Sequence, residues 1–227
     1  MTVHMRNTIP WAEPTLWGRE EEYAVDALRS TWISGGPYVD RLEADFARYA
    51  DARHVLAVAN GTAALHLAYL GAGIGAGDEI IVPGFAFMAA ANMARMVGAT
   101  PVFADIDPHT WCITAEAVAP LITQRTRAIV PVHTYGNVCA MEALLALGEE
   151  RGVLVIEDAA ESIGSRWRGR MSGTIAPMGV YSFHATKTIT TGEGGAVTTQ
   201  DDDLAQRMRL YRSHGMGRTR YLHEVAG

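Results

Sequence analysis

The chain has 227 residues, enough for one large domain or two small ones, with 48% hydrophobic and 19% charged residues, as in ordinary globular proteins. The formal net charge of -6, without any block of lysine or arginine, argues against non-specific nucleic-acid binding. No apolar stretch approaches the length of a membrane span, and Met1–Pro10 lacks the apolar core of a secretory signal, so we expect a cytoplasmic protein.

Apolar residues at helical spacing predict two helices at the start of the chain, over Arg19–Thr31 and Val39–Tyr49. From His54 onward, apolar runs typical of strands alternate with helical patterns. The expected strands are His54–Ala59, Glu79–Val82, Thr100–Ala104, Ala128–Val132, Val153–Ile156, Gly179–Phe183 and Gly195–Thr199. The expected helices are Thr62–Leu70, Phe87–Val97, Ala115–Ile122, Ala140–Arg151 and Leu204–His214.

Strands that alternate with helices predict an α/β fold with a mostly parallel central sheet and helices on both faces, preceded by a helical segment over about residues 1–50. Ligands of such sheets bind beyond the carboxyl ends of the strands. Polar or aromatic clusters fall at four of those ends. They are Asn60-Gly61-Thr62, Pro83–Phe87, His133–Asn137 and Glu157-Asp158.

The end of the strand Val153–Ile156 carries a candidate buried acid, Asp158. A carboxylate there is costly unless a cation or a hydrogen-bond donor meets it. The protonated ring nitrogen of pyridoxal 5'-phosphate (PLP) is one such partner, and a structural salt bridge is the other interpretation.

A lysine lies in an unusual loop further along the chain. Lys187 is followed by Thr188-Ile189-Thr190-Thr191-Gly192-Glu193-Gly194-Gly195, a run whose glycines suit a close backbone approach. A solvated surface lysine is the common case. The buried acid upstream favours instead a lysine that forms a Schiff base with PLP. His184 is interpreted as a satisfied loop histidine rather than a site residue.

Two further features fit a bound phosphate and a flat ring. Gly61 and Thr62 open a predicted helix whose N–H groups would attract a phosphate, although a threonine at this position is also a routine helix cap. Ser182, before the lysine loop, is a second candidate for the same phosphate. Phe87 could stack on the ring, but either Phe85 or Phe87 could equally be a core residue.

Two other kinds of site are disfavoured. The glycine-rich run Gly71–Gly77 follows a helix and precedes a strand, the reverse of a dinucleotide-binding loop, so we interpret it as a helix end and a turn. The histidines show no spacing typical of a metal site. Cys112 and Cys139 are far apart and form no CxxC motif, which fits free thiols in a reducing compartment.

With these motifs, the sequence resembles the DegT/StrS-type PLP-dependent nucleotide-sugar aminotransferases, a group of the fold type I aminotransferases, and within it the perosamine-synthase type, from about Ile9 to Gly227. The resemblance is carried by five segments. They are Ala12-Glu13-Pro14, Trp32-Ile33-Ser34-Gly35-Gly36, Asn60–Leu65, Glu157-Asp158-Ala159-Ala160-Glu161 and Lys187–Gly195.

The resemblance implies a role for each candidate residue. Lys187 would be the Schiff-base lysine and the acid/base, and Asp158 would pair with the pyridine nitrogen. The remaining cofactor contacts would be a ring stack by Phe87, a phosphate site of Gly61, Thr62 and Ser182, and Glu161 near the cofactor hydroxyl. The implied reaction is a ping-pong transfer of an amino group from L-glutamate to a nucleotide-linked keto-deoxy sugar, with a 4-keto-6-deoxy hexose as the expected acceptor.

The family continues past residue 227 into a small C-terminal domain, so the resemblance also implies that this sequence lacks that domain, and that the full-length protein is a homodimer. Three alternatives stay open on sequence grounds. They are a keto-cyclitol aminotransferase of an antibiotic pathway, an inactive truncated PLP-binding fragment, and, remotely, an NAD-binding oxidoreductase. A sugar dehydratase of the same superfamily would carry histidine in place of Lys187.

Overall fold

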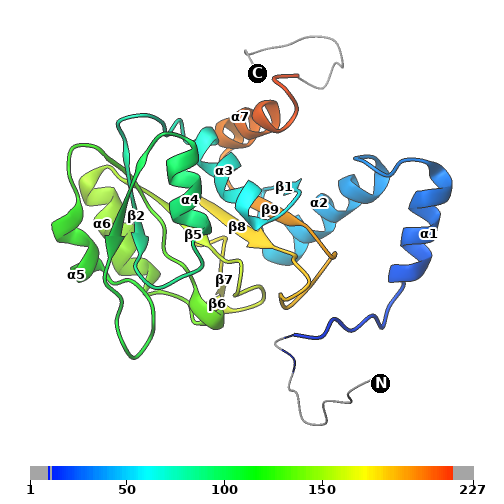
Figure 1. Ribbon diagram of the computed structural model, residues 1–227, viewed down its shortest axis with the longest axis horizontal. Coiled ribbons are helices and arrows are strands. Elements are labelled where there is room, and N and C mark those ends of the chain that lie inside the picture. The colour runs from blue at the N-terminus through cyan, green and yellow to red at the C-terminus, as the bar shows by residue number, and fades with distance from the viewer. Residues whose placement is uncertain (1–9, 11, 217–227) are drawn as a thin grey trace, which may run out of the picture.

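A computed structural model describes Pro10 and residues 12–216 of the chain (Figure 1). Its centre is a seven-stranded sheet with the strand order β1-β9-β8-β5-β4-β2-β3. The sheet strands are β1 His54–Val58, β2 Glu79–Pro83, β3 Thr100–Ala104, β4 Thr126–Ile129, β5 Leu154–Asp158, β8 Met178–Ser182 and β9 Gly195–Thr199. The α-helices are α1 Glu20–Ser30, α2 Pro37–Ala50, α3 Gly61–Gly71, α4 Ala89–Met96, α5 Ala115–Val118, α6 Met141–Arg151 and α7 Asp202–Arg212.

The strand directions confirm a mostly parallel sheet. β3, β2, β4, β5 and β8 are parallel neighbours, and only β9 runs against the strands beside it, β8 and β1. The first residue of β9, Gly195, is in register with both Ser182 and Val58, the last residues of β8 and β1. The loop between β8 and β9 therefore lies at the carboxyl edge of the sheet.

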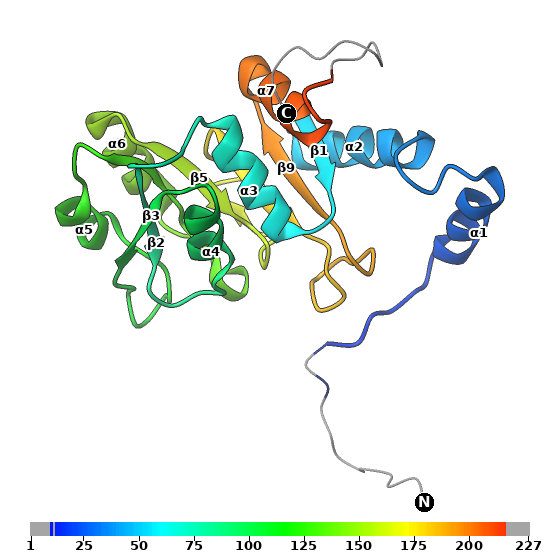
Figure 2. The same cartoon turned by 45° about the horizontal axis from the view of Figure 1, so that its top comes forward.

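Helices cover both faces of the sheet, as the sequence predicted (Figures 1 and 2). Ile156 of β5 belongs to the apolar cluster that contains α3, α4 and α7, whereas its neighbour Val155 belongs to the cluster that contains α5 and α6. Because side chains alternate along a strand, Asp158 follows Ile156 onto the α3 face and Glu157 follows Val155 onto the opposite face. This alternation separates the two acidic residues at the end of β5.

The expected elements are all present, with boundary differences that have physical causes. The helix expected over 115–122 divides into α5 and the 3₁₀ helix η1, Ala119–Leu121, because Pro120 cannot donate the next helical hydrogen bond. β4 begins at Thr126, since buried Thr126 pairs with Glu79 of β2. The small hairpin β6 Arg166–Trp167 and β7 Arg170–Met171 was not expected from sequence.

The glycine-rich run Gly71–Gly77 is a turn, as expected. α3 ends at Gly71, and Gly73 and Gly77 have φ angles of 72° and 91°, a region that favours glycine. Among the described residues, no helix combines the length and the apolar character that crossing a membrane requires. Residues 217–227, where the sequence resemblance places the approach to a C-terminal domain, lie outside the described residues.

Candidate active site

Lys187 lies in the loop between β8 and β9, and this loop is closed at its base. The Phe183 N–H donates to the Gly194 carbonyl at 2.8 Å, and the Thr191 N–H donates to the Phe183 carbonyl at 3.0 Å. The Lys187 side chain is 22% exposed, and its Nζ lies 3.1 Å from Oε1 of Glu161. Lys187 is therefore not a solvated surface lysine. It is also the only lysine of the whole sequence.

Asp158 is buried at the end of β5, with 5% of its surface exposed. Its Oδ1 accepts the Ala160 N–H at 3.1 Å. Burial raises the pKa of this carboxyl above its ordinary value, and the Ala160 N–H, the nearby His133 and the Lys187 ammonium partly offset the shift. The charges of Asp158 and Lys187 thus affect each other. The Asp158 carboxylate can accept a hydrogen bond from a cationic donor.

A narrow backbone cradle forms where β1, β8 and β9 meet. The Asn60 side chain caps α3 by accepting the Ala63 N–H at 2.8 Å, so the first N–H groups of this eleven-residue helix face the edge of the sheet. A Cβ on Gly61 would lie 2.9 Å from the Cβ of Ser182, and one on Gly195 would lie 2.5 Å from the carbonyl carbon of Asn60. The structure therefore brings Gly61 and Ser182 together, with Thr62 in the same first turn of α3.

Phe87 lies in the loop between β2 and α4, which begins at Ala89 rather than at Phe87. Its ring is 79% exposed, and that of Phe85 is 46% exposed. The expectation that one of these two phenylalanines is a core residue is wrong, because the strand β2 ends at Pro83 and both side chains lie beyond it. The stacking role of Phe87 on a cofactor ring stays a prediction.

An aromatic row borders the site, and sequence reasoning did not identify it. The rings of Phe85 and Trp111 are 6.0 Å apart, and those of Trp111 and Tyr135 are 5.5 Å apart, both edge to face. Tyr135 has a φ of 51° and donates its backbone N–H to Oε2 of Glu161 at 2.9 Å. Glu161 thus holds the Tyr135 amide with one oxygen and Lys187 with the other. The polar cluster His133–Asn137, which follows β4, was a sequence signal for the position of Tyr135.

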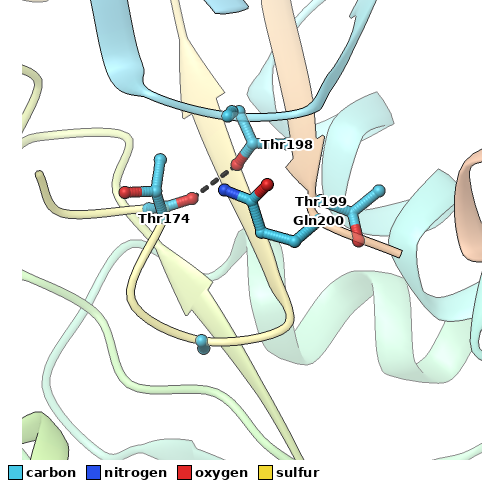
Figure 3. Close-up of a pocket in the computed structure, with 7 residues that line it drawn as sticks. Thr174, Thr198, Thr199 and Gln200 are labelled. Atoms are coloured by element: carbon cyan, nitrogen blue, oxygen red, sulfur yellow. Dashed lines mark hydrogen bonds between the residues drawn. The ribbon is translucent and has the colours of Figure 1, made fainter. Parts of the chain in front are cut away.

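A small surface hollow lies at the opposite edge of the sheet and is not a competing site (Figure 3). Thr198 and Thr199 line it, and their hydroxyls donate to the carbonyls of Gly173 and Pro177 at 2.5 and 2.7 Å. The Gln200 side chain bonds the backbone of Arg53 and Asp51. Since its polar lining is already satisfied within the protein, the hollow offers a ligand few partners.

Comparison with known proteins agrees with this geometry. Residues 15–227 match the DegT/DnrJ/EryC1/StrS aminotransferase family. GDP-perosamine synthase of Caulobacter vibrioides is 46% identical over 218 residues, which cover 95% of this chain and 59% of that protein. The chain spans between 54% and 61% of the length of the curated relatives it matches.

Solved structures give the same result. The aminotransferase from Psychrobacter cryohalolentis superposes with a TM-score of 0.90 at 37% identity, over 96% of this chain and 58% of that one. The PLP-form of Spr1654 from Streptococcus pneumoniae superposes with a TM-score of 0.90 at 30% identity, over 97% of this chain and 62% of that one. With the family match over nearly all of its length, this chain belongs to the DegT/DnrJ/EryC1/StrS aminotransferase family.

Proposed function

We propose that the protein is a PLP-dependent aminotransferase that moves an amino group from L-glutamate to a nucleotide-linked keto-deoxy sugar, with a 4-keto-6-deoxy hexose as the preferred acceptor. The observation that carries the proposal is the convergence of Lys187, Asp158 and the Gly61–Ser182 cradle at one edge of the sheet. The name of the Caulobacter relative, GDP-perosamine synthase, supports a nucleotide sugar as the acceptor.

The residues present fit PLP. The buried Asp158 carboxylate suits a protonated pyridine nitrogen, because such a cation would offset the cost of burying the charge. The N-terminus of α3, with Gly61 lacking a side chain beside Ser182, suits a phosphate. Phe87 would cover one face of the ring, and Glu161 would lie near the ring hydroxyl. PLP supplies an electron sink that stabilises negative charge on the carbon being aminated or deaminated.

The protein's own groups account for the remaining steps. Lys187 would hold the PLP aldehyde through its Nζ and, once freed, would carry a proton between the substrate carbon and that Nζ. Glu161 orients that Nζ through the 3.1 Å contact. Because the same lysine serves both half-reactions, L-glutamate and the keto sugar occupy the site in turn, which is a ping-pong order.

We further propose that the protein works as a homodimer in the cytoplasm. Exposed apolar side chains on the segment around α1 support a partner copy, and the negative net charge and lack of basic blocks give no support to nucleic-acid binding. Sugar nucleotides and glutamate are both cytoplasmic metabolites in this proposal, so the location follows from the substrates.

The test is an absorbance spectrum of the purified protein with PLP, before and after L-glutamate, followed by borohydride reduction and peptide mass analysis. We expect a yellow protein that bleaches with L-glutamate, and a reduced adduct on Lys187. Since the sequence holds no other lysine, the α-amino group is the only competing primary amine.

Lys187→Ala should lose both the adduct and the bleaching, and Lys187→Arg serves as a charge-preserving control that should lose them too. A GDP-linked 4-keto-6-deoxy hexose should then restore the colour of the bleached wild-type protein. Bleaching by L-glutamate in Lys187→Ala, or an adduct confined to the α-amino group in the wild-type protein, would overturn the proposal.

A further inference from the structure

A second buried carboxylate lies directly behind the site. Glu157 is fully buried and precedes Asp158 in β5, on the opposite face of the sheet. Its two oxygens accept four hydrogen bonds, two each, and none comes from a cationic side chain. The donors are the N–H groups of Ile175 at 2.7 Å, Ala176 at 2.6 Å and Gly173 at 2.8 Å, and Nε2 of His133 at 2.9 Å. All acceptor positions of a carboxylate are thereby used.

The hydrogen bonds of His133 fix its tautomer. The ring is fully buried, and its Nδ1 lies 3.3 Å from the backbone nitrogen of Cys139, whose N–H it accepts. Nδ1 therefore carries no hydrogen, and the hydrogen on Nε2 is donated to Glu157. Protonation of His133 would set an Nδ1–H against the Cys139 N–H. The pair is thus a carboxylate with a neutral imidazole.

Backbone hydrogen bonds connect this pair to the site residues. The His133 N–H donates to the Asp158 carbonyl at 3.0 Å, and the Asp158 N–H donates to the Pro131 carbonyl at 2.9 Å. The turn that follows His133 carries Tyr135, whose N–H holds Glu161 at 2.9 Å. Glu161 in turn holds Lys187 at 3.1 Å. Moving the His133 backbone would shift Asp158 and Lys187 relative to each other.

We propose that Glu157 and His133 are positioning residues for the aminotransferase site. The pair holds the end of β4 against the end of β5, and it thereby sets the distance between the Asp158 carboxylate and the Lys187 amine. This inference rests on the proposed function for its consequence in the reaction. The tautomer of His133 and its hydrogen bond to Glu157 follow from the structure alone, and both can be tested without PLP.

The first experiment measures the histidine tautomers by ¹⁵N NMR of the protein without PLP. We expect the His133 ring to carry its hydrogen on Nε2, as its two hydrogen bonds require. Glu157→Gln should perturb the His133 signals. A His133 ring that carries its hydrogen on Nδ1, or whose signals do not respond to Glu157→Gln, would overturn the proposal whatever the enzyme does.

The second experiment separates positioning from simple stability. His133→Gln keeps an amide donor near Glu157, whereas His133→Leu removes it. We expect His133→Leu to lower the maximal rate of bleaching by L-glutamate at least tenfold, with little change in the half-saturating concentration of L-glutamate, and His133→Gln to recover most of that rate.

The matched control is Thr199→Val, which removes the buried hydroxyl that donates to the Pro177 carbonyl and accepts the Asp201 N–H, neither of which contacts Glu157 or His133. It should lower the melting temperature and leave the maximal rate unchanged. Equal rates in His133→Leu and Thr199→Val, at equal loss of stability, would refute the positioning role. If the wild-type protein does not react with L-glutamate, the proposed function fails, and the NMR result still decides the His133–Glu157 link.

Discussion

Asp158 illustrates at the scale of one residue how a site residue can oppose folding. Burial raises its pKa in the folded state above the value in the unfolded chain. The folded protein therefore binds the Asp158 carboxyl proton more tightly than the unfolded chain does. At neutral pH, where Asp158 is charged, its burial lowers the free energy of unfolding. That penalty disappears as the pH falls below the unfolded value.

Asp158→Asn should consequently stabilise the PLP-free protein while it harms the reaction. We expect the free energy of unfolding to rise at pH 7, with a smaller gain near pH 4, because the unfavourable buried charge is absent in the variant. The rate of bleaching by L-glutamate should fall about 100-fold, the scale of losing one preorganised charge. Urea denaturation at several pH values, together with stopped-flow absorbance, measures both effects.

Asp107→Asn provides a control of opposite sign. Backbone N–H groups of Thr110 and His109 lower the pKa of Asp107, so its charged form stabilises the fold at neutral pH and this contribution is lost as the pH falls through the folded pKa. Its substitution should destabilise the protein more at pH 7 than at pH 3. A destabilising Asp158→Asn at pH 7 would contradict our account of the buried acid.

Substitution of Glu161 should affect two contacts, because its two carboxylate oxygens bind different partners. Glu161→Ala should leave both Lys187 Nζ and the Tyr135 N–H without their acceptor, whereas Glu161→Gln keeps one accepting oxygen. We expect the rate of borohydride-trapped adduct formation with PLP to fall in the order wild type, Gln, Ala, by about tenfold overall. The stability change should stay near 1 kcal/mol, since the pair is partly exposed. Identical trapping rates in all three proteins would rule out an orienting role.

At the scale of elements, the phosphate cradle depends on the close approach of α3 to β8. Alanine is the better helix former, yet Gly61→Ala would place a Cβ 2.9 Å from the Ser182 Cβ. We expect this variant to bind PLP at least tenfold more weakly and to lose about 1–3 kcal/mol of stability from overpacking. Equilibrium dialysis with PLP and thermal melting measure the two effects.

Gly75→Ala is the matched control, because its added Cβ would meet nothing closer than 3.9 Å. It should leave PLP affinity unchanged and alter stability by less than about 1 kcal/mol. PLP affinity of Gly61→Ala equal to that of Gly75→Ala would place the phosphate elsewhere.

The elements also show what the sequence could predict. The run Val153–Ile156 and the flanks of the lysine loop were recognisable because buried parallel strands are continuous apolar segments, and the parallel topology then brings Asp158 and Lys187 to one edge. The contact of the Tyr135 N–H with Glu161 was not predictable, because a backbone donor leaves no trace in residue identity. The His133–Glu157 pair joins residues 24 positions apart through strand register, which no local pattern encodes.

At the scale of the whole molecule, helix α1 stands apart from the sheet, whereas α2 packs against it (Figures 1 and 2). α1 has no buried residue, and it meets α2 through Tyr23 and Tyr38, whose ring centroids lie 5.5 Å apart. A helix of eleven residues has little stability of its own in water. Trp17 and Ile33, on either side of α1, are 89% and 73% exposed. The exposed apolar surface of this segment is consistent with the proposed second copy of the chain.

The proposed homodimer makes this segment testable. The double variant Trp17→Ser with Ile33→Ser should shift the protein from dimer toward monomer in sedimentation velocity at micromolar concentration, because it removes two large exposed apolar side chains from the proposed interface. Phe103→Ser is the control, since Phe103 is also exposed but lies on β3, the strand at the opposite edge of the sheet from β1. It should leave the dimer intact. Dissociation by Phe103→Ser alone would move the interface to the β3 edge, and the segment around α1 would then need another explanation for its exposed apolar surface.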